Sequence, residues 1–129
     1  MPVTYSTAVK TARMTAVRDQ IDAGGAAGKL EICSAGYASV LATITLGYSG
    51  ASTGTVSGAV LTLAGFPRSD TSADASGTAA VARIRTSANA DVITGLTVGT
   101  SGSDINLDSV NITAGQTVTI NSATVTHAA

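Results

Sequence analysis

The sequence predicts a mainly β fold, an antiparallel β-sandwich of the jelly-roll type with one α-helix at its N-terminus. From residue 28 onward, short runs with a hydrophobic residue at every second position alternate with glycine- and serine-containing turns. Before them, Thr7–Ala23 contains neither proline nor glycine and has helical periodicity. No further helical segment alternates with the strand-like runs, which argues against a parallel α/β sheet.

The composition suits strands in one compact domain. We expect the 129 residues to form a single domain, with an N-terminal arm and helix over residues 1–25 and the sandwich over residues 28–127. The chain contains 23 Ala, 20 Thr, 14 Ser and 14 Gly, and β-branched and hydroxylated side chains are common in strands. Only 12% of the residues are charged. So sparsely charged a chain is expected to cover part of its surface with a partner or with copies of itself.

Charge and residue usage exclude several classes of protein. A net charge of −1, with three Tyr, one Phe and no Trp, provides neither the basic surface nor the stacking platform of a nucleic-acid-binding protein. The single cysteine, Cys33, excludes a disulfide framework. No apolar run approaches the ~18 residues of a membrane span, and the first residues show no secretion signal. We therefore expect neither nucleic acid nor a membrane as a partner.

The helix is expected to begin after Ser6 or Thr7 as N-cap and to end before the Gly24-Gly25 pair. Its side chains form two stripes. One stripe is made of small residues and is expected to lie against the sheet: Val9, Ala12, Ala16 and Ala23. The other is expected to face a neighbouring subunit: Met14, Val17 and Ile21.

Seven or eight strands are expected to follow. The segments are Lys29–Cys33, Val40–Leu46, Ala59–Leu63, Thr78–Thr86, Val92–Val98, Asp104–Asp108, Val110–Ile112 and Gln116–Thr126. Gly95 is a candidate bulge, and the hydrophobic alternation of the last segment changes phase at Asn121-Ser122, which predicts a bulge or bend. Leu41 is expected to point outward. Of the two longer connections, Gly47–Gly58 is expected to be a mobile hairpin tip and Pro67–Gly77 a polar, turn-rich segment.

Three short motifs resemble known sites, and each lacks part of its pattern. Gly50–Gly54 has the G-x-S-x-G spacing of a hydrolase nucleophile but stands in a low-complexity loop, and the lone histidine, His127, is close to the last residue. Ala23–Leu30 runs from helix to strand, the wrong order for a phosphate loop. Asp104–Asp108 begins like a calcium loop, without the glycine and the glutamate that should follow. We therefore predict no enzyme and no catalytic, cofactor-binding or metal-binding residues.

Other polar side chains allow two interpretations each. Asp70 and Asp74 either ligate a cation across their loop or form Asx turns. Arg83 and Arg85 share one face of a strand and either hold a carboxylate on a partner or are solvated surface charges. Cys33 is expected to be an inert, buried thiol.

The order of several stretches along the chain is also informative. Residues 5–13 read YSTAVKTAR, and after the helix residues 28–32 read GKLEI. Further on come SDTSADASGTA at residues 69–79, GTSGSD at residues 99–104 and AGQTV at residues 114–118. This pattern, which covers nearly the whole chain, resembles a family of small virion proteins of tailed bacteriophages.

The resemblance implies a capsid decoration, or cement, protein: a β-sandwich that sits on the major capsid protein at the virion surface, as a trimer or dimer, after synthesis in the host cytoplasm. It offers no catalytic residues. The residues expected to make contact with the shell or with other copies are Tyr5, Arg13, Met14, Val17, Arg83 and Arg85. The alternatives are another virion component, such as a neck, tail-tube or tail-tip protein, and a host-surface binding module.

Overall fold

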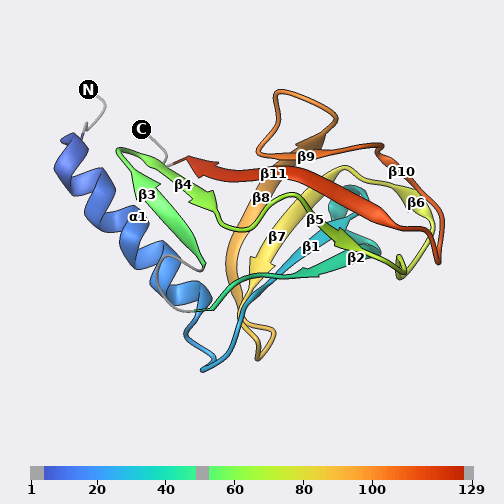
Figure 1. The fold of residues 1–129 in the computed structure, drawn as a ribbon, viewed down its shortest axis with the longest axis horizontal. Helices are drawn as coiled ribbons and strands as arrows, with labels where there is room; N and C mark the ends of the chain where they lie inside the picture. The colour runs from blue at the N-terminus through green and yellow to red at the C-terminus, as the bar shows by residue number, and fades with distance from the viewer. Residues whose placement is uncertain (1–4, 49–52, 127–129) are drawn as a thin grey trace.

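The computed structural model describes residues 5–48 and 53–126, in which one helix precedes eleven short strands (Figure 1). The helix is α1 (Thr7–Ile21), and one 3-10 turn, η1, spans Ala35–Tyr37. The strands are β1 (Lys29–Cys33), β2 (Val40–Thr45), β3 (Gly54–Ser57), β4 (Val60–Leu63), β5 (Arg68–Asp70), β6 (Gly77–Thr78), β7 (Val81–Arg85), β8 (Asp91–Gly99), β9 (Ile105–Leu107), β10 (Asn111–Ile112) and β11 (Val118–Thr126). The prediction of a mainly β fold with one N-terminal helix is confirmed.

Most strands belong to one curled, mixed sheet. Its order is β2-β1-β7-β8-β9-β11-β4-β3, and β4 and β5 pair with successive parts of β11. Its pairs are antiparallel except for β8 with β9, which run parallel. A separate two-stranded sheet joins β10 to β6. The predicted sandwich or jelly roll is not confirmed, because these strands form a single sheet that curls around its own core (Figure 1).

Two bulges at the predicted positions help the sheet to bend. The register of β8 against β7 slips by one residue next to Gly95, whose φ of 77° is unstrained only for glycine. The register of β11 against β9 slips between Ile120 and Ser122. The second slip keeps the hydrophobic residues on both sides of it buried, as the change of phase in the sequence predicts.

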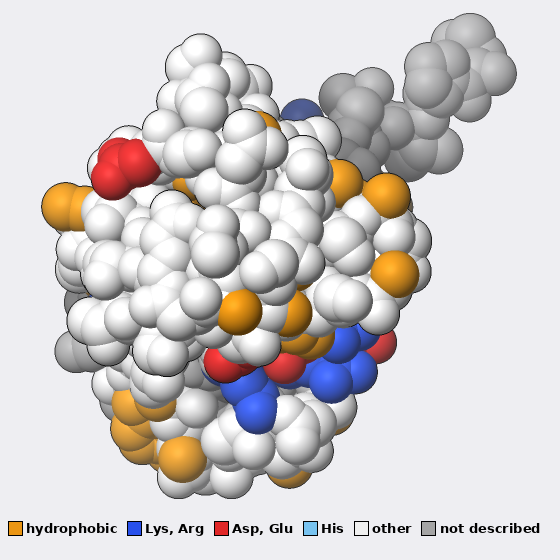
Figure 2. Space-filling model, turned by 90° about the vertical axis from the view of Figure 1, so that its right-hand side faces the viewer, with side chains coloured by type: hydrophobic (Ala, Val, Ile, Leu, Met, Phe, Trp, Pro, Cys, Tyr) orange, Lys and Arg blue, Asp and Glu red, His pale blue; other side chains and the backbone are white. Residues whose placement is uncertain are grey.

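The surface carries few charged groups, in keeping with a chain of which 12% is charged. Figure 2 shows one end of the molecule, where atoms of charged and hydrophobic side chains cover only part of the surface. Most of the Lys and Arg atoms visible on this face lie together, beside acidic side chains. On this face, most of the positive charges therefore lie next to negative ones.

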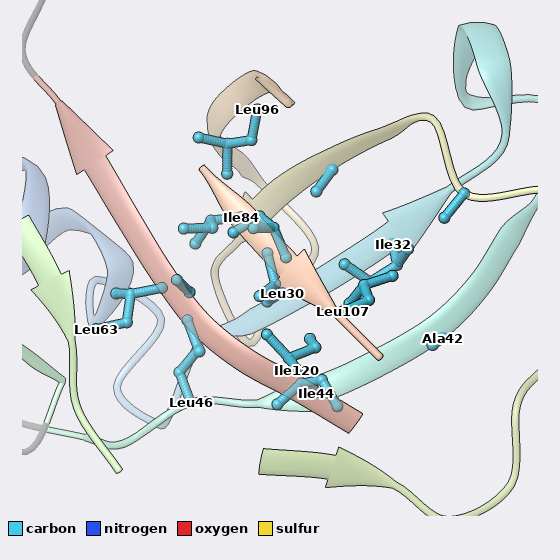
Figure 3. Close-up of a cluster of buried hydrophobic side chains, with 14 of the residues drawn as sticks. Leu30, Ile32, Ala42, Ile44, Leu46, Leu63, Ile84, Leu96, Leu107 and Ile120 are labelled. Carbon is cyan, nitrogen blue, oxygen red and sulfur yellow. The ribbon is translucent and has the colours of Figure 1, made fainter. Parts of the chain in front are cut away.

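The inside of the curl is filled by aliphatic side chains from most strands. Figure 3 shows side chains of β1, β2, β7, β9 and β11 pointing toward one another. Among the largest fully buried residues are Leu30, Ile32, Ile84, Ile105, Leu107 and Ile120. Removing apolar surface from water favours folding by about 25 cal/mol per Å². Because these residues come from strands far apart in the sequence, this gain is available only after the sheet has curled.

The helix docks with the face opposite to the one predicted. Its N-cap is Ser6, whose Oγ accepts the N–H of Val9 at 3.3 Å. Met14 is 2% exposed and Ile21 is fully buried, whereas Val9 is 43% exposed. The long side chains of Met14, Val17 and Ile21 remove more apolar area from water than the alanines of the other stripe. Met14 and Val17, which were predicted to contact a partner, therefore pack on the core of the chain itself.

The connection Gly47–Gly58 is not a simple loop. It contains β3, and its Thr53 is fully buried, with the hydroxyl donating to the carboxylate of Asp22 at 2.9 Å. This bond ties β3 to the end of α1, where the helix dipole alone disfavours an acidic residue. Residues 49–52 lie outside the described part of the chain.

The second connection, Pro67–Gly77, folds back over β2. The N–H of Asp74 donates to the carbonyl of Leu41 at 2.7 Å, and Ala73 is buried. Leu41 is fully buried as a result, so the prediction that it points outward is wrong. Local alternation in β2 does not reveal this cover, because the covering segment lies about thirty residues later in the chain.

Replacing Met14 by alanine is expected to lower the free energy of unfolding by about 2–5 kcal/mol, because it removes a buried side chain and leaves a cavity. Val9→Ala, on the exposed side of the same helix, is the matched control and should change it by less than about 0.5 kcal/mol. Urea denaturation followed by circular dichroism measures both. Small and equal effects would contradict the observed docking of the helix.

Candidate functional site

A network of charged side chains crosses β1, β7 and β8. The Nε of Arg83 donates to Oε1 of Glu31 at 2.6 Å, and the Nε of Arg85 donates to Oδ1 of Asp91 at 2.6 Å. Arg85 also lies 3.8 Å from Glu31, which is only 7% exposed. The β-sheet register sets these contacts, since Glu31 lies opposite Arg83, and Arg85 opposite Asp91. The role predicted for the two arginines, holding a partner's carboxylate, is therefore taken by carboxylates of the chain itself.

These contacts fix the charge states of the groups involved. The hydrogen bond to Glu31 raises the pKa of Arg83 above its usual range. The hydrogen bond from Arg85 lowers the pKa of Asp91 below its usual range. Arg83 and Asp91 are thus charged at neutral pH, and each is compensated by its own partner, Glu31 and Arg85 respectively.

Tyr37, which sequence reasoning missed, joins this network to the bulge in β8. Its φ is 59°, an unusual value for a bulky residue. Its hydroxyl oxygen accepts the N–H of Gly95 at 2.6 Å, and its ring centre lies 5.3 Å from the guanidinium carbon of Arg83. The ring therefore holds the bulge and the ion pair in fixed relation. Its only sequence signal is its place after Gly36 in a turn that follows a strand.

Cys33 is fully buried at the end of β1, as predicted. Its Sγ is 3.9 Å from the carbonyl oxygen of Glu31. Burial raises the pKa of the Cys33 thiol above its usual range. A protonated, inaccessible thiol is a poor nucleophile and a poor metal ligand.

The two acidic residues of the Pro67–Gly77 segment bond to the protein. Oδ1 of Asp70 accepts the N–H of Ser72 at 3.0 Å, which is an Asx turn, and Oδ2 accepts the N–H of Thr43 at 3.0 Å. Oδ2 of Asp74 accepts the hydroxyl of Thr43 at 3.1 Å. For Asp70 the structure therefore favours the Asx-turn interpretation over a cation site.

The remaining motif residues have structural partners or lie outside the described chain. Asp104 accepts the N–H of Thr97 at 3.0 Å, and Asp108 accepts the amide N–H of Asn121 at 2.9 Å. Across residues 5–48 and 53–126, no three His, Cys, Asp or Glu side chains come together in a way that could hold a metal ion. Most of the hydrolase-like string, residues 50–52, and the lone histidine are not among the described residues. No helix in the described part has the length and apolar character needed to cross a membrane.

The outward face of α1 brings together two of the predicted contact residues. Tyr5 is 38% exposed, and the guanidinium carbon of Arg13 lies 4.7 Å from the centre of its ring. Val9, Ala12 and Ala16 are also exposed on this helix. We call these five residues the helix surface. It combines an exposed aromatic ring, a stacked cation and small side chains.

The helix surface leads into a groove of about 400 Å³ between α1 and the β7–β8 turn. Its lining consists mostly of small or apolar side chains: Ala16, Val17, Gln20, Ala23, Thr86, Ala90, Asp91 and Val92. Asp91 links the groove to the charge network through Arg85. The groove thus has a rigid, charge-compensated wall on one side and the helix on the other.

Comparison with known proteins gives no match, either to a family model, to a curated protein or to a solved structure. The interpretation of the helix surface and the groove therefore rests on their own chemistry. That chemistry combines small and apolar side chains with the guanidinium of Arg13 and the carboxylate of Asp91, and it includes no cluster of metal-ligating groups among the described residues.

Glu31→Ala is expected to lower the free energy of unfolding by about 1–3 kcal/mol, because it leaves the largely buried guanidinium of Arg83 without its partner. The control is Asp19→Ala, which removes the carboxylate of an exposed pair with Arg18 at 3.4 Å. That change should cost less than about 1 kcal/mol. Thermal and urea denaturation measure both variants, and equal costs would show that the network is no stronger than a surface pair.

The Cys33 thiol is expected to react with Ellman's reagent at pH 8 only as fast as the protein unfolds, because it is buried and protonated. In denaturant the reaction should be rapid and stoichiometric. Ala12→Cys in a Cys33→Ala background places a thiol on the helix surface and should react at once under native conditions. Rapid reaction of native Cys33 would contradict its burial.

Proposed function

We propose that the protein is a structural, non-enzymatic subunit that docks through the helix surface onto a larger protein assembly, namely the capsid shell of a tailed bacteriophage. The observation that carries this proposal is the grouping of Tyr5, Val9 and Arg13 on the exposed side of α1. Tyrosine and arginine are the residue types that dominate binding energy at protein interfaces.

The shape and charge of the surroundings support docking to protein. Ala12 and Ala16 allow a partner to approach the helix closely, and the adjoining groove can receive a partner side chain. The arginines of β7 are satisfied within the chain. Binding would therefore depend on shape and apolar area more than on net charge, which suits a chain with a formal charge of −1.

The proposed action is mechanical. A decoration subunit adds buried area across the joints between major capsid protein subunits. Each contact is small, but repetition by symmetry, as copies that pair or form trimers on the shell, makes the whole lattice harder to open. The virion surface is the location that this proposal requires, and the resemblance of the sequence to phage virion proteins supports it.

The test uses purified particles of the phage that encodes the chain, prepared without it. Added wild-type protein should cosediment with these particles in many copies. Tyr5→Ala/Arg13→Ala should weaken binding at least about tenfold, because it removes both anchor side chains. Tyr48→Ala is the matched control, since Tyr48 is 47% exposed but does not belong to the helix surface.

Denaturation curves must first show that all three proteins are equally folded. Equal binding by both variants would contradict docking through the helix surface. Failure of the wild type to bind shells would contradict the decoration role, and presence in only a few copies per particle would indicate a neck or tail component.

A further inference from the structure

The exposed side of α1 carries different features at its two ends. Near the N-terminus, the ring of Tyr5 lies against the guanidinium of Arg13, whose carbon is 4.7 Å from the ring centre. Near the C-terminus, the groove opens between the helix and the β7–β8 turn, with Gln20 and Asp91 among its lining residues. Ala16 is exposed on the helix and also lines the groove, so the helix surface and the groove form one continuous face.

The polar groups at the two ends complement each other. In residues 5–48 and 53–126, Arg13 takes part in no ion pair and donates no side-chain hydrogen bond. At the groove, Asp91 accepts the Nε of Arg85 through Oδ1, and its side chain is 50% exposed. Its Oδ2 has no hydrogen-bond partner within the described chain. One end therefore offers an unused cationic donor, and the other offers an unused carboxylate acceptor.

A two-fold axis perpendicular to α1 brings the two ends of this face together. It sets two copies of the helix antiparallel, and each flank of one helix then lies beside the same flank of the other. Arg13 and Gln20 are seven residues apart and therefore share a flank. Arg13 of one copy thus comes beside Gln20 and Asp91 of the second copy, and symmetry repeats the contact. Near the axis, Ala12 and Ala16 allow the helices to approach closely.

The groove has room for the Tyr5 ring of a second copy. Its volume of about 400 Å³ exceeds the roughly 150 Å³ of a cavity that holds benzene. Val17 and Val92 provide apolar contact for the ring, and the side-chain amide of Gln20 can bond to its hydroxyl, which needs a partner once it is buried. A second copy therefore supplies both the ring and the cation that match the groove.

We propose that two copies of this chain pair in solution through the exposed side of α1, with Tyr5 of each copy in the groove of the other and Arg13 beside Asp91. The pair covers both helix surfaces, so docking on a shell would require the two copies to separate. That consequence rests on the proposed function. The pairing itself does not, and it is tested on the free protein, so each can fail without the other.

Sedimentation velocity tests the pairing. The wild type should dimerise with a dissociation constant in the micromolar range, because an interface of one helix and a groove is small. Ala16→Glu sets two carboxylates near each other across the axis and should weaken dimerisation at least about tenfold. Ala114→Glu is the matched control, since Ala114 is exposed in the turn between β10 and β11, at the opposite end of the molecule (Figure 1).

Both substituted alanines are exposed, so urea denaturation should show both variants to be as stable as the wild type. A wild type that stays monomeric well above micromolar concentration would overturn the proposal. A trimer, or equal dimerisation of the two variants, would overturn it as well.

Isotope-filtered nuclear Overhauser effects in a mixture of labelled and unlabelled protein test the orientation. Ring protons of Tyr5 in one copy should show cross-peaks to the methyl group of Ala23, a groove residue, in the other. Within one chain these residues flank a helix of 15 residues, which is about 22 Å long, so such cross-peaks arise only between copies. Cross-peaks between the two Tyr5 rings instead would indicate a parallel pair and contradict the antiparallel one.

A double-mutant cycle tests the polar contact. Arg13→Gln and Asp91→Asn should each weaken dimerisation by about two- to fivefold per contact. Asp91→Asn keeps an oxygen for Arg85, so the charge network retains its hydrogen bond. The double variant should dimerise more tightly than the product of the two single effects predicts. Independent effects would show that Arg13 and Asp91 do not meet.

Discussion

The contact between β5 and β2 closes the curled sheet, and the core depends on that closure. A single sheet has two faces and covers a core only if it bends back on itself. Here β11 carries β5 around to the edge of β2, where Arg68 and Asp70 bond to its backbone. Ile44 and Ile120 can then meet inside the curl (Figure 3). The bulges in β8 and β11 provide the bending that brings these two ends together.

The charged side chains near β1 also satisfy one another. The chain has few ionisable side chains, and the ones near β1 pair across adjacent strands, with Glu31 between Arg83 and Arg85. Glu31 is buried against Arg83, so removing either partner would leave a charge without compensation. With these charges compensated, the outward face of α1 is the surface through which we propose that the chain contacts another protein.

Local pattern predicted much of this structure and failed where contacts are long-range. The N-cap at Ser6, the bulge at Gly95 and the change of phase after Ile120 are local, and all three are observed. The prediction of which face of α1 packs on the core was wrong. Which stripe docks depends on how much apolar area the sheet can cover, and the helix sequence alone does not show this. The burial of Leu41 depends on a segment far along the chain. Of the predicted contact residues, Tyr5 and Arg13 are exposed next to each other, and helical spacing makes this possible. The pairing of Arg83 and Arg85 with carboxylates of the chain could be predicted only with knowledge of the strand register.

The closure of the sheet is tested most directly by nuclear Overhauser effects in the isotopically labelled protein. If β5 covers β2 as described, the amide proton of Thr43 will show cross-peaks to the β protons of Asp70, and the amide proton of Asp74 will show a cross-peak to the α proton of Leu41 or Ala42. Absence of these cross-peaks, together with contacts from the Thr43 amide to a different strand, would contradict a sheet that closes through this contact.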